Sequence, residues 1–203
     1  MTRGHAFIYL ASQSPRRKQL LEQLGVRIEL LLPRADEDAE ALEQELEGEA
    51  PRLYVERVTL AKLHAAKARR LHRGLPAAPI LASDTTVALG RRILGKPADA
   101  EEARATLRLL SGRTHRVITA VAVSEGRHEH LLTNVSHVHM IELDELQIER
   151  YVQSGEPFGK AGAYAIQSEA AAWIDRIEGS YSSIMGLPLY ETARLLRQAH
   201  VKF

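Results

Sequence analysis

The segment AFIYLASQSPRR at residues 6–17 decides the fold class of this sequence. Residues 6–10 are apolar and predict a short buried strand. Ser14 and Pro15 then predict the start of a helix, because serine is a good N-cap and proline fits the first helical position. This helix ends before Gly25 and carries one apolar stripe, formed by Leu20, Leu21 and Leu24. A strand, a turn and a helix in this order are typical of α/β proteins.

The rest of the chain continues this alternation. The sequence predicts further strands at residues 26–32, 79–83, 93–94, 116–123, 130–143 and 171–177. It predicts further helices at residues 51–74, 99–110, 144–153 and 188–199. The strands 116–123 and 130–143 are expected to form an antiparallel pair. Because no linker stands out, we predict a single domain over residues 1–203, an α/β fold with a mixed β-sheet flanked by helices.

The composition restricts the class of protein. Lys and Arg total 27 of the 203 residues and Asp and Glu total 26, so the formal charge is +1. A chain this close to neutral is not expected to coat a nucleic acid polymer, which needs a basic surface. The absence of cysteine excludes disulfides, thiolate nucleophiles and cysteine metal sites, and it fits a cytoplasmic protein. No apolar run approaches the length of a membrane span, so no membrane association is expected.

The first chemical feature lies at the turn before the first helix. Ser12, Ser14, Arg16 and Arg17 bring two hydroxyls and two guanidiniums to a helix N-terminus. The free N–H groups and the dipole favour anions there, and arginine donates bidentate hydrogen bonds to phosphate. Positive side chains at this end are unfavourable unless an anion joins them. We therefore predict a phosphate site, with a capped surface helix as the alternative.

Three further charged residues lie at a strand end and in small-residue turns. Asp84 is expected at the carboxyl end of the strand 79–83, where ligands bind in open α/β sheets. Lys96 follows in a Gly-Lys-Pro turn, and Lys160 lies in the glycine-rich segment 154–167, which can approach a ligand closely. The alternatives are a turn residue for Asp84, a solvated lysine for Lys96 and a plain flexible loop for the last segment.

The histidines offer no metal-ligand spacing with a carboxylate. Two i, i+2 pairs, each on one face of a predicted strand, are formed by His128, His130, His137 and His139. We interpret them as exposed hairpin histidines rather than as metal ligands. His115 is expected to order a turn.

Five segments together resemble the Maf family of nucleoside triphosphate pyrophosphatases, in the same order and at compatible spacing. They are residues 10–17 (LASQSPRR), 83–86 (SDTT) with 94–97 (LGKP), 110–115 (LSGRTH), 154–167 (SGEPFGKAGAYAIQ) and 179–188 (GSYSSIMGLP). The fourth segment is similar to the subgroup that acts on dTTP and UTP, rather than to the subgroup that acts on 7-methyl-GTP. The resemblance implies an elongated α/β fold like that of inosine triphosphatases, dependence on a divalent metal, Mg²⁺ or Mn²⁺, and a homodimer.

The resemblance also implies roles for single residues. The phosphate-binding positions that it implies are Ser12, Arg16, Arg17 and Lys160. The catalytic positions are Asp84, as proton acceptor, with Glu37, Lys62 and Lys96. Base selection is implied for Arg16, Thr85 and Gln167. Two positions depart from the subgroup: Gly159 stands where an acid usually precedes the lysine, which removes a possible metal or orienting carboxylate, and Ser168 stands where glycine is usual.

The chemistry supports the same interpretation. Hydrolysis between the α and β phosphates needs about four negative charges to be neutralised, which basic side chains and a carboxylate-held metal provide. We expect Asp84 and Glu37 to hold or orient metal and water, because an isolated carboxylate is a weak base and a metal acidifies bound water. The amide of Gln167 can pair with uracil or thymine, the alternative being an ordinary loop hydrogen bond.

The predicted function is hydrolysis of dTTP and UTP to the nucleoside monophosphate and pyrophosphate, which removes or balances pyrimidine nucleotides. The substrate is a small molecule, and neither a nucleic acid nor a membrane is an expected partner. The alternative is a nucleotide-binding regulator of cell division with little turnover.

Overall fold

The computed structural model describes residues 4–34, 37 and 40–203. Its centre is a seven-stranded sheet in the order β2, β1, β3, β5, β6 and β7, with β4 paired to β3 outside this path. The strands are β1 (Ile8–Leu10), β2 (Ile28–Leu30), β3 (Ile80–Leu89), β4 (Arg92–Leu94), β5 (Thr114–Glu125), β6 (His128–Met140) and β7 (Ile174–Glu178). β1 runs parallel to β2 and β3, and the other pairs are antiparallel. The predicted α/β class with a mixed sheet is therefore confirmed.

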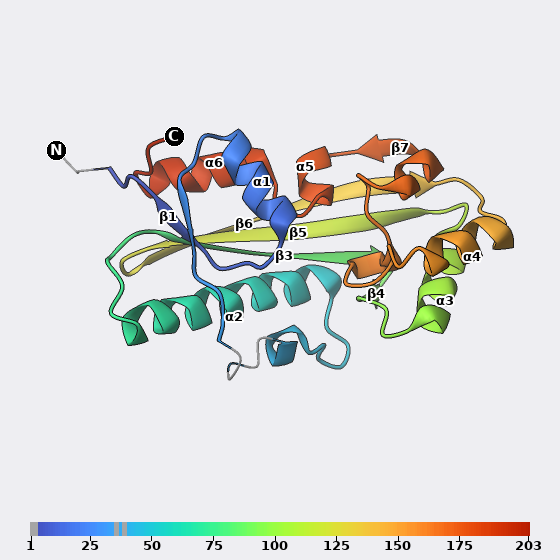
Figure 1. The fold of residues 1–203 in the computed structure, drawn as a ribbon, viewed down its shortest axis with the longest axis horizontal. Coiled ribbons are helices and arrows are strands. Elements are labelled where there is room, and N and C mark those ends of the chain that lie inside the picture. Colours follow the sequence, from blue (N-terminus) through green and yellow to red (C-terminus); the bar gives the residue numbers. More distant parts are fainter. Residues whose placement is uncertain (1–3, 35–36, 38–39) are drawn as a thin grey trace.

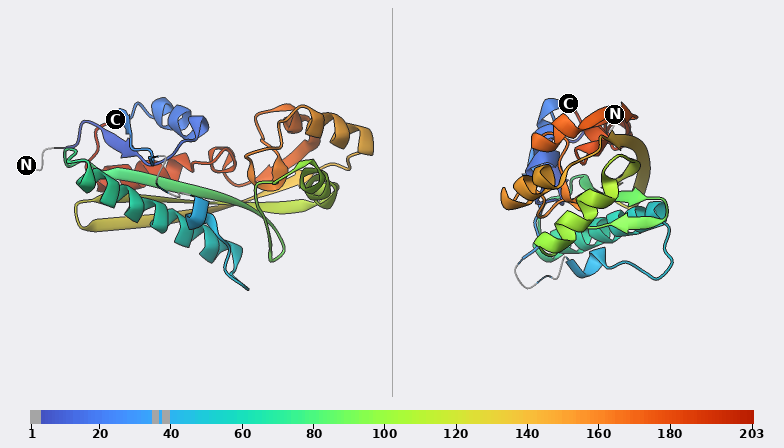
Figure 2. Two further views of the ribbon diagram at one scale, coloured as in Figure 1. Left: turned by 60° about the horizontal axis from the view of Figure 1, so that its bottom comes forward. Right: turned by 90° about the vertical axis from the view of Figure 1, so that its right-hand side faces the viewer.

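Helices cover both faces of this sheet and one of its ends. They are α1 (Pro15–Gln23), α2 (Pro51–His72), α3 (Ala100–Leu110), α4 (Glu145–Gln153), α5 (Tyr181–Ile184) and α6 (Leu189–Gln198), with 3₁₀ turns η1 (Glu40–Glu43), η2 (Ala161–Ala163) and η3 (Glu169–Trp173). Figure 1 shows an elongated molecule in which α2 follows one side of the sheet and α1 and α6 lie on the other. Helices α3 and α4 lie together at the far end of the long strands (Figure 2).

Apolar stripes on the helices explain these layers. Val55, Val58 and Leu63 of α2 are buried against β3 and β5. On the opposite face, Leu21 of α1 and Leu196 of α6 belong to one buried cluster. The end formed by α3 and α4 has its own core, which includes Leu107, Tyr151 and Trp173. Each helix is therefore held where its apolar face meets the sheet or another helix, which is the main stabilising contribution to such packing.

Strand β3 is longer than the sequence predicted. The prediction ended the strand at residues 79–83 and placed Asp84 at its carboxyl end, but β3 continues to Leu89. The β-branched residues 85–87 favour an extended backbone, and β5 pairs with β3 through this whole region. Asp84 therefore lies in the middle of the strand, opposite Ala120 of β5.

The space beside Asp84 results from the shortness of β1. The pairing of β1 with β3 ends at Leu81, after which the chain leaves the sheet and enters α1. β4 pairs with the same strand only from Val87 onward. Between these two points, residues 82–86 of β3 have no strand neighbour on that edge within the described part of the chain. A carboxylate in mid-strand thus gains access to a crevice that other strand positions lack.

Most other elements lie close to their predicted positions. The side chains of Asp99 and Asp144, the first residues of two predicted helices, cap α3 and α4. The predicted strand at residues 171–177 begins instead as part of η3, because its alanine-rich start has low strand propensity, and β7 begins at Ile174. Helix α5 was not predicted; the side chain of Ser180 caps it. Within the described ranges, no helix has the length and apolar character needed to cross a membrane.

The prediction that His115 orders a turn is wrong. This residue lies within β5, an inner strand of the sheet, and is only 1% exposed because Tyr164 packs against it. The His115 Nε2 atom lies 2.7 Å from the Tyr164 hydroxyl, and the two rings pack edge to face. Burial lowers the pKa of His115 to about 4. By contrast, His128, His130 and His137 are exposed on the hairpin, as predicted. The fourth histidine, His139, is half-buried, because its Nδ1 lies 2.6 Å from the Asp175 carboxylate of β7.

Burial of His115 makes folding stability depend on pH. An unfolded histidine binds a proton below about pH 6.5, whereas the folded protein excludes that proton until about pH 4, so stability falls as the pH decreases between these values. We expect this group to cost about 3 kcal/mol of unfolding free energy between pH 7 and pH 4. Denaturant unfolding of the wild type and of His115→Gln at four pH values measures the difference, with the exposed His128→Gln as control. Equal pH dependence in the wild type and His115→Gln would contradict it.

Candidate active site

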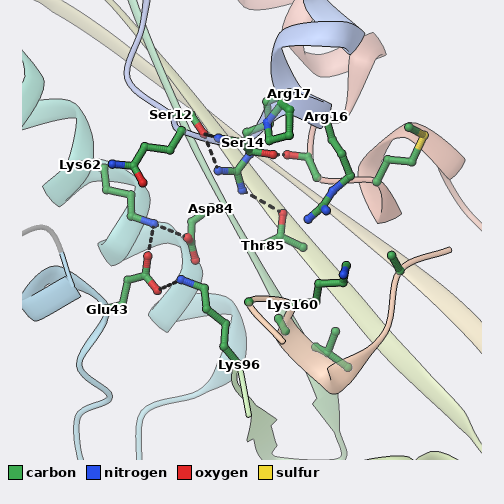
Figure 3. Close-up of a pocket in the computed structure, with 18 of the residues that line it drawn as sticks. Ser12, Ser14, Arg16, Arg17, Glu43, Lys62, Asp84, Thr85, Lys96 and Lys160 are labelled. Carbon is green, nitrogen blue, oxygen red and sulfur yellow. Dashed lines mark hydrogen bonds and ion pairs between the residues drawn. The ribbon is translucent and has the colours of Figure 1, made fainter. Parts of the chain in front are cut away.

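A cavity of about 420 Å³ opens between the start of α1, the helix α2, the strand β3 and the loop before η3. Its size is in the range for small-molecule sites. The predicted site residues that line it are Ser12, Arg16, Arg17, Lys62, Asp84, Thr85, Lys96, Lys160 and Gln167. Figure 3 shows side chains from these separate segments converging on one space. The fold thus brings together residues that lie more than 150 positions apart in the chain.

Arg17 is held in the cavity wall by neutral oxygen atoms. Its Nε donates to the Gly186 carbonyl at 2.8 Å, and its Nη1 donates to the Ser12 hydroxyl at 3.1 Å. Its Nη2 donates to the Thr85 hydroxyl at 3.3 Å. Burial lowers the pKa of Arg17, and the charge of Asp84 opposes that shift. No carboxylate among the described residues is bonded to this guanidinium, so its charge is directed at whatever anion enters the cavity.

A chain of hydroxyl groups orients Thr85. The Thr119 hydroxyl donates to the Ser183 carbonyl at 2.8 Å, and its oxygen lies 3.0 Å from the Thr85 hydroxyl. Because Thr119 has only one proton and gives it to the carbonyl, Thr85 must be the donor to Thr119. The Thr85 oxygen is then left as an acceptor for Arg17. Polar groups of β3, β5 and α5 therefore fix the direction of the guanidinium.

Three other predicted residues lie around the cavity with few or no partners in its wall. Arg16 makes no hydrogen bond or ion pair with any residue that the structure describes, and its side chain points toward Lys160 and Thr85 (Figure 3). The Lys160 ammonium donates to the Glu156 carbonyl and lies 3.3 Å from the Glu156 carboxylate. Gln167 lies exposed at the cavity rim. These positions place two positive charges and one amide around the entrance.

Opposite the arginines, carboxylate and ammonium groups alternate along a short line. The Lys62 ammonium donates to Asp84 Oδ1 at 2.6 Å and to Glu43 Oε1 at 2.8 Å. The second oxygen of Glu43 accepts from Lys96 at 2.6 Å. The side chains of Asp84 and Lys62 are only 9% and 17% exposed, so their interaction is poorly screened by water. Figure 3 shows this line closing one side of the cavity.

Glu43 was not predicted as a site residue. It is one of eight acidic residues between positions 36 and 49, and no spacing in that run distinguishes it from its neighbours. The structure selects it through packing, because the buried Tyr54 of α2 donates a hydrogen bond to the Glu43 carbonyl at 2.9 Å. Its side chain then extends toward the two lysines.

The carboxylate of Glu37 pairs with arginines rather than with these lysines. It accepts three hydrogen bonds from Arg69, at 2.6 to 3.0 Å, and lies 3.6 Å from Arg73. Hydrogen bonding to Arg69 is the largest cause that lowers the pKa of Glu37 to about 2. Arg69 lines the cavity, whereas Glu37 is not among the lining residues within the described ranges. The structure therefore brings Glu37 to the site only through Arg69.

The model of the Maf-like protein family matches residues 7–199. The chain belongs to the Maf family. Three curated relatives named dTTP/UTP pyrophosphatase are similar over nearly their full length. The protein of Burkholderia pseudomallei is 60% identical, and the match covers 98% of this chain and 97% of the relative. The protein of Cupriavidus pinatubonensis is 59% identical over 98% of this chain and 100% of the relative, and that of a Polaromonas species is 61% identical over 97% of each. The resemblance found in the five sequence segments is thus confirmed.

Among solved structures, the Staphylococcus aureus Ham1 protein is similar to this Maf chain at 16% identity, over 66% of this chain and 71% of that chain, with a TM-score of 0.39.

The two departures from the subgroup pattern have local explanations in this Maf chain. Gly159 lines the cavity and has a φ of +71°, a left-handed conformation that favours glycine over a side chain. The Ser168 hydroxyl donates to the Ala165 carbonyl at 2.9 Å and lies 3.2 Å from the Tyr151 hydroxyl. Ser168 therefore stabilises the turn that follows Gln167.

The carboxylates of this Maf site suit a cation that takes some of its ligands from the protein and the others from the substrate. Within the described ranges, no group of three histidine, aspartate or glutamate side chains could hold a metal alone. Mg²⁺ is commonly bound by one or two carboxylates, with substrate phosphates and water as the remaining ligands. The second oxygen of Asp84 makes no hydrogen bond to a described residue and is available for such a role.

The fixed guanidinium of Arg17 is expected to be the main anchor for phosphate. Arg17→Lys keeps the positive charge but removes the planar donors that reach Gly186, Ser12 and Thr85. We expect binding of inorganic tripolyphosphate, measured by calorimetry, to weaken about tenfold, which is the effect of losing roughly one charged hydrogen bond.

The matched control is Lys18→Gln, which removes an exposed positive charge from the same helix. Unchanged tripolyphosphate affinity in Arg17→Lys, or an equal loss in Lys18→Gln, would be evidence against an anchoring role.

Proposed function

We propose that this Maf protein hydrolyses dTTP and UTP to the nucleoside monophosphate and pyrophosphate, and so removes or balances pyrimidine nucleotides. The observation that carries the proposal is the cavity in which Arg16, Arg17 and Lys160 lie opposite the carboxylate of Asp84. Relatives about 60% identical to this chain bear the name dTTP/UTP pyrophosphatase, which supports the same substrates. We place the activity in the cytoplasm and assign it to a homodimer, in agreement with the sequence-based expectation.

In this proposal, different basic residues bind different parts of the phosphate chain. Ser12 and Arg17 form the fixed part of the site, and Arg16 and Lys160 approach from the more open side. Lys62 and Lys96 lie on the side of Asp84 and stabilise the charge that develops on the leaving pyrophosphate. Cation density on both sides of the cleaved bond is the requirement for phosphoryl transfer to water.

Asp84 receives the proton of the attacking water. Its Oδ1 already accepts a hydrogen bond from Lys62, which fixes the orientation of the carboxylate and leaves Oδ2 facing the cavity. Water forms a new bond to the α-phosphorus while the bond from that phosphorus to the bridging oxygen breaks. Pyrophosphate leaves with the bridging oxygen, and the proton of the water passes to Asp84.

A divalent cation, Mg²⁺ or Mn²⁺, would supply charge neutralisation and acidify the attacking water. Asp84 is the carboxylate that would hold it, with phosphate oxygens as further ligands. Glu37, which we also assign to the metal, would have to exchange Arg69 for the cation in order to contribute.

Base selection is assigned to Gln167, with Arg16 and Thr85 nearby. The Gln167 amide offers one acceptor and one donor, which complement the N3–H and a carbonyl of uracil or thymine. Its side chain is exposed at the rim and bonds no described residue. Because a freely rotating amide would also pair with cytosine, discrimination requires a neighbour that fixes the orientation of the amide once the nucleotide is bound. Thr85 acts through Arg17, which it orients.

Asp84→Asn tests the role of the proton acceptor. The variant keeps the size of the side chain but cannot accept a proton, so we expect turnover of UTP to fall by about three orders of magnitude. UTP binding measured with a chelator present, so that no metal bridges Asp84 and the phosphates, should not weaken, because no phosphate donor is removed. Pyrophosphate release and calorimetry measure these two quantities.

Asp175→Asn, in an exposed ion pair with His139, serves as the control for Asp84→Asn. Near-normal turnover in Asp84→Asn would refute the assignment.

The choice of base is tested with a panel of UTP, dTTP, CTP and 7-methyl-GTP, each with Mg²⁺ or Mn²⁺. We expect the wild type to release pyrophosphate preferentially from UTP and dTTP. In Gln167→Ala the ratio of kcat/KM for UTP over CTP should fall about tenfold, because the hydrogen bonds that distinguish the bases are lost. The exposed Gln198→Ala is the matched control.

A full UTP preference in Gln167→Ala would contradict base readout by this amide. Absence of pyrophosphate release from every nucleotide would favour a nucleotide-binding regulator of cell division instead of an enzyme.

A further inference from the structure

The carboxylate of Glu43 forms ion pairs with two of the cationic side chains that would bind the phosphate chain. One of its oxygens accepts from Lys62 at 2.8 Å and the other accepts from Lys96 at 2.6 Å. An ammonium bonded to a carboxylate cannot give the same hydrogens to a phosphate oxygen. Lys62 gives two of its three hydrogens to Glu43 and Asp84, and Lys96 gives one of its three to Glu43. A bound polyphosphate and the Glu43 carboxylate therefore compete for the position beside both ammonium groups.

Glu43 is negatively charged when this competition takes place. Burial raises its pKa, but the charges and hydrogen bonds of Lys62 and Lys96 outweigh that effect and hold the pKa below its usual value. A carboxylate between two ammonium groups thus mimics an anionic ligand in the free protein. Beside a bound phosphate chain the same carboxylate would be repelled.

The backbone around Glu43 is anchored, so the exchange concerns its side chain. The Tyr54 hydroxyl donates to the Glu43 carbonyl at 2.9 Å, and Arg57 donates to the Gln44 carbonyl at 2.9 Å. Both donors belong to α2, the helix that also carries Lys62. Rotation of one partly exposed side chain is a small change compared with the opening of a loop.

We propose that Glu43 is an internal competitor of the phosphate chain, bonded to Lys62 and Lys96 in the free protein and displaced when phosphates bind. The proposal rests on the proposed function only in that the cavity takes a phosphate chain. Return of the carboxylate to the lysines after cleavage would favour dissociation of pyrophosphate. Glu43 therefore lowers affinity for both substrate and product, and it sets the rate at which the site is cleared.

The proposal is tested by binding rather than by turnover. Dissociation constants for inorganic tripolyphosphate and pyrophosphate are measured by calorimetry with a chelator present, so that neither metal nor hydrolysis contributes. In Glu43→Gln we expect both ligands to bind roughly fivefold to tenfold more tightly, the effect of no longer having to break two partly exposed ion pairs. Glu47→Gln, an exposed neighbour outside the line of ion pairs, should bind like the wild type.

Glu43→Asp separates competition from simple charge repulsion. The shorter side chain keeps the negative charge but cannot span both lysines, so competition predicts tighter binding than in the wild type. Repulsion alone predicts unchanged binding for Glu43→Asp and tighter binding only for Glu43→Gln, and that result would overturn the proposal. Thermal unfolding midpoints of all variants establish that each is folded.

The remaining outcomes separate this inference from the proposed function. Unchanged or weaker binding in Glu43→Gln overturns the inference while leaving hydrolysis of UTP and dTTP intact. Tighter binding in both Glu43 variants, together with no hydrolysis of any nucleotide by the wild type, supports the inference and overturns the enzyme. No tripolyphosphate binding by any variant overturns both.

Discussion

The pairing of β3 with β5 along the whole of β3 is the constraint on which the site depends. Full pairing on one side keeps the strand straight and extended through Asp84 and Thr85, while β1 leaves the other side after Leu81. The edge so exposed is the floor of the cavity. A shorter β3 would place Asp84 in a turn, and a longer β1 would cover it. The two lengths together produce a rigid strand with an open flank, and rigid elements hold reactive groups more precisely than loops do.

The cations of the site fall into two kinds with different partners. Among the residues that the structure describes, Arg17 is bonded only to neutral oxygens, and the hydroxyl chain from Thr85 to Ser183 fixes its direction. Lys62 and Lys96 are instead bonded to carboxylates, which a ligand can replace. The first arrangement provides a preorganised anion receptor, and the second compensates the largely buried ammonium of Lys62 and the exposed ammonium of Lys96 while the site is free of ligand. The pairing of the lysines follows from the cost of leaving a charge unpaired in a poorly solvated cavity, whereas Arg17 has hydrogen bonds to neutral oxygens and keeps its charge for an entering anion.

The net charge of +1 acquires a specific meaning in this arrangement. Its small value disfavours a protein that coats a nucleic acid polymer, but it also hides strong local separation of charge. The arginines of α1 lie on one side of the cavity, and the alternating line from Asp84 to Lys96 lies on the other. Such a site is suited to one small polyanion, whose charges meet cations on both sides.

The sequence by itself determined the elements whose signals are local. The caps Asp99 and Asp144, the N-terminal Pro15 and the apolar stripes of the helices depend on residues within a few positions, so their helices could be predicted. The resemblance also identified the family and nine of the residues that line the cavity. Only the tertiary structure decided the rest, because it depends on contacts between distant segments. Where β3 ends is set by β5, the burial of His115 is set by the loop at Tyr164, and one glutamate among eight acidic residues reaches the lysines because α2 anchors its backbone.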